Sequence, residues 1–230
     1  SQPKPKLGKV HLVPTGFQHR SYHDDDGVEH GYSVFIPEAY NSATRWPAIF
    51  FMHGAGERGT NNRSQLEVGL APVVRRQAES FPAIVFFPQA RLDWSKDRAD
   101  LNRAVAEFAR VEQEFSIDPD RVYVTGISMG GHGTWDAVHL CPGRFAAAVP
   151  ICGFFDRDIE PMLKLPMWFF HGADDSVVPV HHSRDAVAAL RSAGAVVRYT
   201  EYHEVDHDSW VRAYDAPELF EWMFKQRRGG

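Results

Sequence analysis

From residue 46 onward the sequence alternates between short apolar runs and longer segments with helical periodicity, and this alternation constrains the fold more than any other feature. It is typical of an α/β protein, in which a mostly parallel, twisted sheet is covered by helices on both faces. The apolar runs are bounded by turn residues, as expected for buried parallel strands. We expect these strands at residues 48–52, 83–87, 122–125, 146–151, 167–170 and 196–200.

The segments between these runs predict helices. The clearest covers residues 100–115, where apolar side chains recur at i, i+3 and i+4 and only Glu112 interrupts the stripe. Because the carboxyl ends of parallel strands meet at one edge of such a sheet, we expect the functional residues there. The other predicted helices cover residues 64–80, 129–140, 182–192 and 217–225.

The region before residue 46 predicts an antiparallel hairpin. Two strand-like runs, 9–13 and 31–37, flank the turn signal Asp-Asp-Asp-Gly at residues 24–27. No internal linker or repeat separates this region from the rest. A length of 230 residues suits one α/β domain, so we expect a single domain over residues 1–230 with a flexible segment at residues 1–8.

Composition limits the partners. There are 25 Lys and Arg against 30 Asp and Glu, giving a formal net charge of −5, whereas nucleic acids and anionic membranes are bound through clustered basic residues. No apolar stretch approaches the roughly 18 residues of a membrane span. We therefore expect no nucleic-acid or membrane partner. The oligomeric state is left open.

The cysteines predict two free thiols. Cys141 ends a predicted helix, whereas Cys152 follows a predicted strand, so they belong to opposite edges of the sheet and lie too far apart for a disulfide. No metal site is predicted. The adjacent residues His181 and His182 should point in different directions, and no acidic ligand set converges on them.

Residues 126–130 read Gly-Ile-Ser-Met-Gly and match G-x-S-x-G, the strained strand-to-helix turn that exposes a serine hydroxyl. The motif follows an apolar run and precedes a helical segment, which is the context that the motif requires. Ser128 is therefore the candidate nucleophile. The alternative is a glycine-rich turn with an idle serine.

A serine hydroxyl is a poor nucleophile until a histidine, oriented by a carboxylate, takes its proton. In this architecture the chain order is Ser, then Asp or Glu, then His. Two adjacent carboxylates, Asp174 and Asp175, follow the strand at 167–170, and the residues alone leave both open. For the base we favour His207 over His203, because His203 lies almost on the last strand and His207 is far enough beyond it to reach Ser128.

Acyl transfer also needs two N–H donors for the developing oxyanion. The first should be the N–H of Met129, the residue after the nucleophile. The second should come from the small residues after the strand at 48–52, where we assign Ala55 with Gly56 as the alternative. Trp94 follows a strand at the same edge, so it is a candidate substrate-binding wall, with a packing role as the alternative.

These motifs together resemble those of the α/β-hydrolases. The narrower resemblance is to the compact carboxylesterases and "predicted peptidases" related to polyhydroxybutyrate depolymerases and to feruloyl and acetylxylan esterases, and it extends over about residues 30–226. In the H-G-x-x-D-x-x-V-P form of the third motif the acid falls on Asp175, so the resemblance selects Asp175 over Asp174. The motifs that carry it are residues 53–59, 121–131, 171–179 and 207–210.

The resemblance implies hydrolysis of carboxylic esters by a catalytic triad, without a cofactor, and secretion in many relatives. Lids in this family usually follow the sixth strand, but only residues 152–165 are available there, so we expect no large cap and an open site. An open site suits short-chain esters and aryl- or sugar-linked esters, either as small molecules or on a polysaccharide. The alternatives are a serine peptidase with the same triad and a non-catalytic binding module on a hydrolase scaffold.

The start of the chain and the family resemblance bear on where the protein is located. The chain starts at Ser1 without an initiator methionine, and it shows no apolar signal core. The missing initiator methionine and the secretion of many members of the resembling family favour a secreted or periplasmic protein, with the cytoplasm as the alternative.

Overall fold

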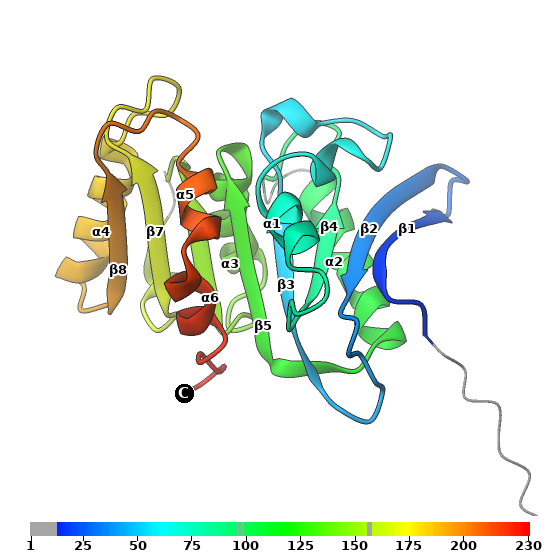
Figure 1. Cartoon of the computed structure of the whole chain (residues 1–230). Coiled ribbons are helices and arrows are strands. Elements are labelled where there is room, and N and C mark those ends of the chain that lie inside the picture. The colour runs from blue at the N-terminus through cyan, green and yellow to red at the C-terminus, as the bar shows by residue number, and fades with distance from the viewer. Residues whose placement is uncertain (1–12, 96, 98, 156–157) are drawn as a thin grey trace, which may run out of the picture.

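The computed structural model describes residues 13–95, 97, 99–155 and 158–230 (Figure 1). The flexible segment predicted for residues 1–8 and all but the last residue of the strand predicted for 9–13 lie outside the described residues. Val13 itself belongs to no strand.

A single eight-stranded sheet crosses the molecule in the order β1-β2-β4-β3-β5-β6-β7-β8. The six strands from β3 to β8 are mutually parallel, whereas β1 and β2 form an antiparallel hairpin whose second strand pairs antiparallel with β4. The predicted fold class is therefore confirmed. The strands are β1 (Gly16–His23), β2 (Glu29–Ile36), β3 (Trp46–Met52), β4 (Ile84–Pro88), β5 (Ile117–Ile127), β6 (Ala147–Ile151), β7 (Met167–Gly172) and β8 (Val197–Tyr202).

Helices cover both faces of the sheet, as Figure 1 shows. One hydrophobic cluster lies between the sheet and α2 (Ala99–Glu114), α3 (Met129–Leu140) and α4 (His181–Ser192). A second cluster lies on the other face, beneath α1 (Leu70–Arg76), α5 (Trp210–Asp215) and α6 (Pro217–Met223). Three short 3-10 helices complete the described elements: η1 (Ala55–Glu57), η2 (Ser64–Leu66) and η3 (Glu160–Met162).

The first strand is not where the sequence predicts it. The hairpin strand β1 covers Gly16–His23, and its residues alternate between exposed and half-buried over most of its length. Since an edge strand with one solvent-facing side needs few apolar residues, its sequence gives a weak strand signal. The helix predicted over 64–80 is also interrupted. Gly69 adopts φ +79° and separates η2 from α1, in a position where a Cβ would lie 2.7 Å from the Phe51 ring.

The connection between β6 and β7 contains only the single-turn helix η3 among its described residues, so no large cap covers the carboxyl edge of the sheet there. Cys141 and Cys152 are free thiols, as predicted. No helix within the described part of the chain is long and apolar enough to span a bilayer.

Candidate active site

Ser128 occupies the turn between β5 and α3 in a conformation that few side chains adopt. Its backbone has φ +54° and ψ −116°, which stores strain of order 1–3 kcal/mol. The turn is tight because its glycines let backbones approach closely. A Cβ on Gly130 would lie 2.0 Å from the Met52 carbonyl oxygen, and one on Gly126 would lie 2.2 Å from the Gly130 carbonyl oxygen. The sequence motif thus forms the sharp strand-to-helix turn that it predicts.

The structure brings Ser128, His207 and Asp175 into one hydrogen-bonded chain. The distance from Ser128 Oγ to His207 Nε2 is 2.8 Å, and His207 Nδ1 lies 2.8 Å from Asp175 Oδ2 and 3.0 Å from Oδ1. The three side chains follow β5, β7 and β8, so they meet at the carboxyl edge of the sheet. Asp174 is exposed and contributes only its backbone N–H, to the Val205 carbonyl. The His203 side chain is 89% exposed.

Two features hold the His207 loop against the turn that carries Asp175. Gly172 allows the backbones to touch, because a Cβ there would lie 2.3 Å from the carbonyl oxygens of both Val205 and Asp206. The Asp206 carboxylate accepts hydrogen bonds from the Ser176 N–H at 2.8 Å, from the Ser176 hydroxyl at 2.9 Å and from the His207 N–H at 2.8 Å. These donors hold the pKa of Asp206 below its usual value, the Ser176 N–H contributing most.

The carboxylate of Asp175 is fully buried and fixed from both sides. Its Oδ1 accepts the N–H groups of Val177 at 2.9 Å and Val178 at 2.8 Å. Behind it lies the buried ring of His171, whose Nε2 is 3.2 Å from Oδ2 and 2.8 Å from the Val178 carbonyl oxygen. Since both of these neighbours are acceptors, Nε2 carries the proton. Burial lowers the pKa of His171 and favours this neutral form.

His171 was not a candidate in the sequence reasoning. Its only signal there is its place at the head of the H-G-x-x-D motif, four residues before the acid. Its Nδ1 accepts the Ser183 hydroxyl at 2.7 Å, so every polar atom of the ring has a partner. The ring is therefore a rigid support for the acid rather than a group that contacts a substrate.

The loop after β3 lies beside Ser128. Gly54 lies against the nucleophile, since a Cβ there would be 3.7 Å from Ser128 Cβ. Neither Ala55 nor Met129 donates its N–H to a protein acceptor among the described residues. Both N–H groups are thus available to bind an oxyanion. Ala55 is the first residue of the short helix η1, and Gly56 is the second.

The orientation of the Gly54–Ala55 peptide is set by His53. The Ala90 N–H donates to His53 Nε2 at 2.9 Å, so the other ring nitrogen, Nδ1, carries the proton and donates it to the Gly54 carbonyl oxygen at 2.6 Å. In a planar trans peptide the C=O and N–H point in opposite directions. The ring therefore directs the Ala55 N–H away from itself. Burial lowers the pKa of His53 to about 4, which keeps the ring neutral at pH 7.

The expectation that Trp94 forms a wall of the site is wrong. Its side chain is 0% exposed, and Nε1 donates to the His53 carbonyl oxygen at 2.9 Å. The indole packs edge-on against the His53 ring, with centroids 4.9 Å apart. The packing alternative therefore applies. Residues after β4 do reach the predicted edge of the sheet, but the Trp94 indole turns inward, where the His53 carbonyl oxygen accepts its N–H, as a buried indole requires.

One group of metal-ligand side chains occurs among the described residues, and it includes two members of the hydrogen-bonded chain. Ligand atoms of Cys152, Asp175 and His207 lie within 4.8 Å of one another. The His207 Nδ1 and the Asp175 carboxylate already bond to each other, and burial raises the pKa of the Cys152 thiol to about 12, which disfavours the thiolate that binds metals. His181 and His182 differ from prediction, because their rings stack with centroids 4.4 Å apart.

A mostly parallel sheet, a serine on a strained turn and a Ser-His-Asp chain at the carboxyl edge define the class of protein: it is an α/β-hydrolase. The family follows from comparison with known proteins. The family model for the dienelactone hydrolase family matches residues 23–216, and the chain belongs to this family.

Individual proteins are also similar to this chain. A thermostable esterase of known structure superposes with a TM-score of 0.80 and 36% identity, over 92% of this chain and 63% of that one. An uncharacterized secreted protein of Arthroderma benhamiae is 25% identical over 72% of this chain. A bifunctional acetylxylan esterase/xylanase of Neocallimastix patriciarum is 24% identical over 68% of it. The chain spans only 21% and 23% of the lengths of these two proteins.

Proposed function

We propose that the protein is a serine carboxylesterase whose catalytic residues are Ser128, His207 and Asp175. The proposal is carried by one observation, the unbroken hydrogen-bonded chain from Ser128 Oγ through the His207 ring to the Asp175 carboxylate, with 2.8 Å at each link. Esterase relatives support it independently. No step of the reaction requires a cofactor.

The reaction proceeds in two steps. His207 Nε2 takes the proton of Ser128 as Oγ attacks the ester carbonyl, and Asp175 stabilises the resulting imidazolium. The N–H groups of Ala55 and Met129 bind the oxyanion. The imidazolium then gives its proton to the departing alcohol, which leaves an acyl-enzyme. In the second step His207 takes a proton from water, the hydroxyl attacks the acyl carbon, and the carboxylic acid leaves as Ser128 regains its proton.

The substrates of this proposal are short-chain esters and esters of aryl acids or sugars. An edge of the sheet without a large cap offers little apolar surface to enclose a long acyl chain, which disfavours lipase-like substrates. Peptide amides are harder to cleave and need an extended subsite that fixes the backbone. They define the second candidate activity. Loss of all turnover with an intact site would instead indicate a binding module.

The test compares Ser128→Ala with a matched exposed serine, Ser42→Ala, on 4-nitrophenyl acetate, feruloyl and acetylated-sugar esters, and peptide amides. We expect the first variant to lose at least about 10⁴-fold in kcat and the control to match the wild type. A fluorophosphonate probe should add its mass to the peptide that carries Ser128. Ester turnover that survives in Ser128→Ala would refute the assignment, and preferential amide cleavage would favour the peptidase.

We also propose export from the cytoplasm. One relative whose name describes a secreted protein supports this proposal. Immunodetection of the native protein in fractionated cultures tests this, and recovery in the cytosolic fraction would contradict it.

A further inference from the structure

A polar cavity lies between the N-terminal hairpin and the segment after η1. Its volume is about 480 Å³, and it is lined by polar side chains and one glycine. A narrow extension shares four of these lining residues and reaches Gln89 and Arg103 beneath them. The side chains that face a ligand in the argument below are Ser21, Glu29, Thr60 and Arg91, and we call this space the polar cavity.

The polar cavity opens at the same edge of the sheet as Ser128. Since β2 runs antiparallel to β4 and Tyr32 pairs with Pro88, the first residues of β2 lie at the carboxyl end of β4. Thr60 comes five residues after Ala55, and a chain of five residues spans at most roughly 18 Å. A substrate with its acyl group at Ser128 can therefore extend along this edge into the cavity if the rest of it is of oligomeric length.

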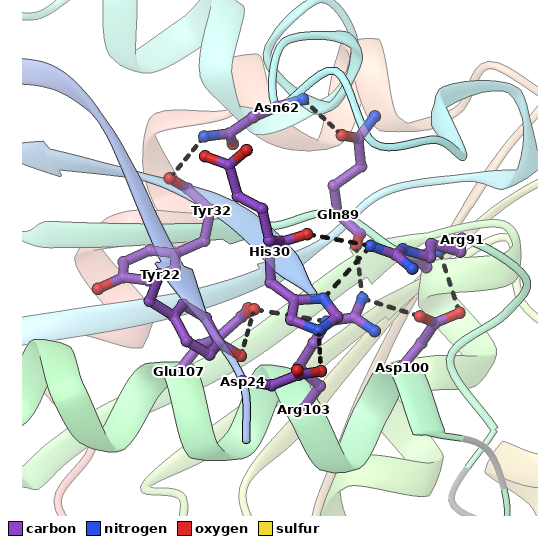
Figure 2. A network of polar contacts seen from close by, with 12 residues as sticks. Tyr22, Asp24, His30, Tyr32, Asn62, Gln89, Arg91, Asp100, Arg103 and Glu107 are labelled. Carbon is purple, nitrogen blue, oxygen red and sulfur yellow. Dashed lines mark hydrogen bonds and ion pairs between the residues drawn. The ribbon is translucent and has the colours of Figure 1, made fainter. Parts of the chain in front are cut away.

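A network of charged and amide side chains, drawn in Figure 2, adjoins the cavity through Gln89, Arg91 and Arg103. Asp100 accepts the backbone N–H groups of Arg91 at 3.0 Å and of Leu92 at 2.7 Å, and pairs with Arg103 at 2.8 Å. Arg103 also lies 3.4 Å from Glu107. Because buried charges are tolerated only when paired, these contacts hold the backbone around Arg91 in one arrangement.

The walls are fixed in a similar way. Asn62 Nδ2 donates to the carbonyl oxygens of Arg20 at 3.1 Å and Tyr32 at 2.9 Å, which joins the 59–62 segment to both strands of the hairpin. The Arg91 guanidinium donates to the Glu29 carbonyl oxygen at 3.2 Å and approaches the His30 ring, which Asp24 holds from the other side at 2.8 Å. The lining is therefore organised before any ligand arrives.

The cavity-lining groups that have no ion-pair or hydroxyl partner indicate which kind of ligand would bind. Within the described residues, Arg91 and Glu29 form no ion pair, and the hydroxyls of Ser21 and Thr60 have no hydrogen-bond partner. One cation and one carboxylate balance each other, and the charge of Arg20 is offset by its ion pair with Glu114. An anionic ligand would need uncompensated cations, and an acyl chain would need an apolar lining. Mixed donors and acceptors without net charge suit hydroxyl groups.

From this chemistry we infer that the polar cavity is a subsite for the neutral carbohydrate part of an ester substrate. The inference rests on the proposed function for the reaction at Ser128, but it assigns the cavity and its ligand class separately. Arg91 and Glu29 bind sugar hydroxyls as donor and acceptor, and Ser21 and Thr60 bound the space that a sugar ring fills.

Kinetics with two substrates test the subsite. Ser21→Trp fills the cavity and Arg91→Met removes its charged donor, while Ser42→Trp and Arg45→Met make the same changes at exposed residues before β3, at the opposite edge of the sheet. The readout is kcat/KM on acetylated xylo-, manno- and gluco-oligosaccharides divided by kcat/KM on 4-nitrophenyl acetate. We expect this ratio to fall about tenfold or more in the two cavity variants, through KM, and to stay at the wild-type value in both controls.

Binding separates this inference from the proposed function. Calorimetry of the unacylated oligosaccharides with Ser128→Ala should show binding that Ser21→Trp removes when it is combined with Ser128→Ala. If the wild type cleaves no ester but this binding is present, the subsite stands and the esterase proposal fails. If esters are cleaved but both substrates lose rate by the same factor, or no neutral oligosaccharide binds, the subsite is refuted. Binding of oligogalacturonate alone would also overturn it.

Discussion

His207 Nδ1 approaches both oxygens of the Asp175 carboxylate, but only Oδ1 accepts backbone N–H groups, so replacing the carboxylate by an amide has a defined consequence. In Asp175→Asn, the position of Oδ1 must keep an oxygen, because the N–H groups of Val177 and Val178 point at it from 2.9 and 2.8 Å. The amide NH₂ therefore takes the position of Oδ2 and donates to His207 Nδ1. The ring then carries its proton on Nε2, facing Ser128, and cannot act as a base.

The magnitude follows from this change of tautomer. The same acid-to-amide change in a serine protease triad lowers kcat about 10⁴-fold, equivalent to roughly 5.4 kcal/mol of transition-state stabilisation. We expect a loss of this order here, because two backbone N–H groups hold the amide oxygen at the Oδ1 position, whereas the one opposing donor, the His171 N–H 3.2 Å from the Oδ2 position, can donate to the Val178 carbonyl oxygen instead. The exposed neighbour Asp174 has no such contacts, so Asp174→Asn should stay within about twofold of the wild type.

The assay is steady-state hydrolysis of 4-nitrophenyl acetate by wild type, Asp175→Asn and Asp174→Asn. Thermal unfolding of each variant separates lost catalysis from lost folding. The activity of Asp175→Asn should rise with pH more steeply than that of the wild type, because hydroxide replaces the missing base. Equal losses in the two variants, or a larger loss in Asp174→Asn, would show that the carboxylate is misassigned.

Three further predictions concern the scaffold of the site. Burial raises the pKa of Glu107 from 4.5 to about 7. This group therefore adds to the unfolding free energy below about pH 4.5, and its contribution is lost as the pH rises to about 7. Urea unfolding of Glu107→Gln should lack this pH dependence of the unfolding free energy. Gly130→Ala should lower the unfolding free energy by more than about 3 kcal/mol, whereas Gly56→Ala, which meets nothing within 4 Å, should change it by less than about 0.5 kcal/mol. His53→Phe removes the donor to the Gly54 carbonyl, so kcat should fall about 10²-fold with little change in KM; an unchanged kcat in folded protein would show that the loop orients itself.

Sequence patterns predicted much of the fold because they reflect local requirements. Buried parallel strands need continuous apolar runs, and helices on a sheet need an apolar stripe, so the helices α2, α3 and α4 and five of the six parallel strands lie within two residues of their predicted positions, while β5 begins five residues earlier than predicted. The position predicted for the edge strand β1 was wrong, since a strand with one solvent-exposed face does not need a continuous apolar run. The two-turn helix α5 was missed because so short a segment has little periodicity.

Some residues of the candidate site could likewise be identified from local sequence, and others could not. The glycines around Ser128 are dictated by local backbone geometry, and the sequence identifies that turn on its own. The choice of acid did not follow from the residues, because Asp174 and Asp175 are neighbours and only the resemblance separated them. The structure decides which of the two faces His207. It also decides that Trp94 packs inside, since burial depends on what surrounds a side chain and not on its position along the chain.

The sequence by itself determined the sheet-and-helix alternation and the turn that holds the candidate nucleophile, because both depend on residues close together in the chain. Only the tertiary structure placed the supports of that site, His171 behind Asp175 and His53 beneath the Gly54 peptide. It alone assembled the polar cavity, whose walls come from the hairpin, the 59–62 segment and Arg91. Hydrogen bonds between such distant segments leave no periodicity in a sequence, so they become visible only when the chain is folded.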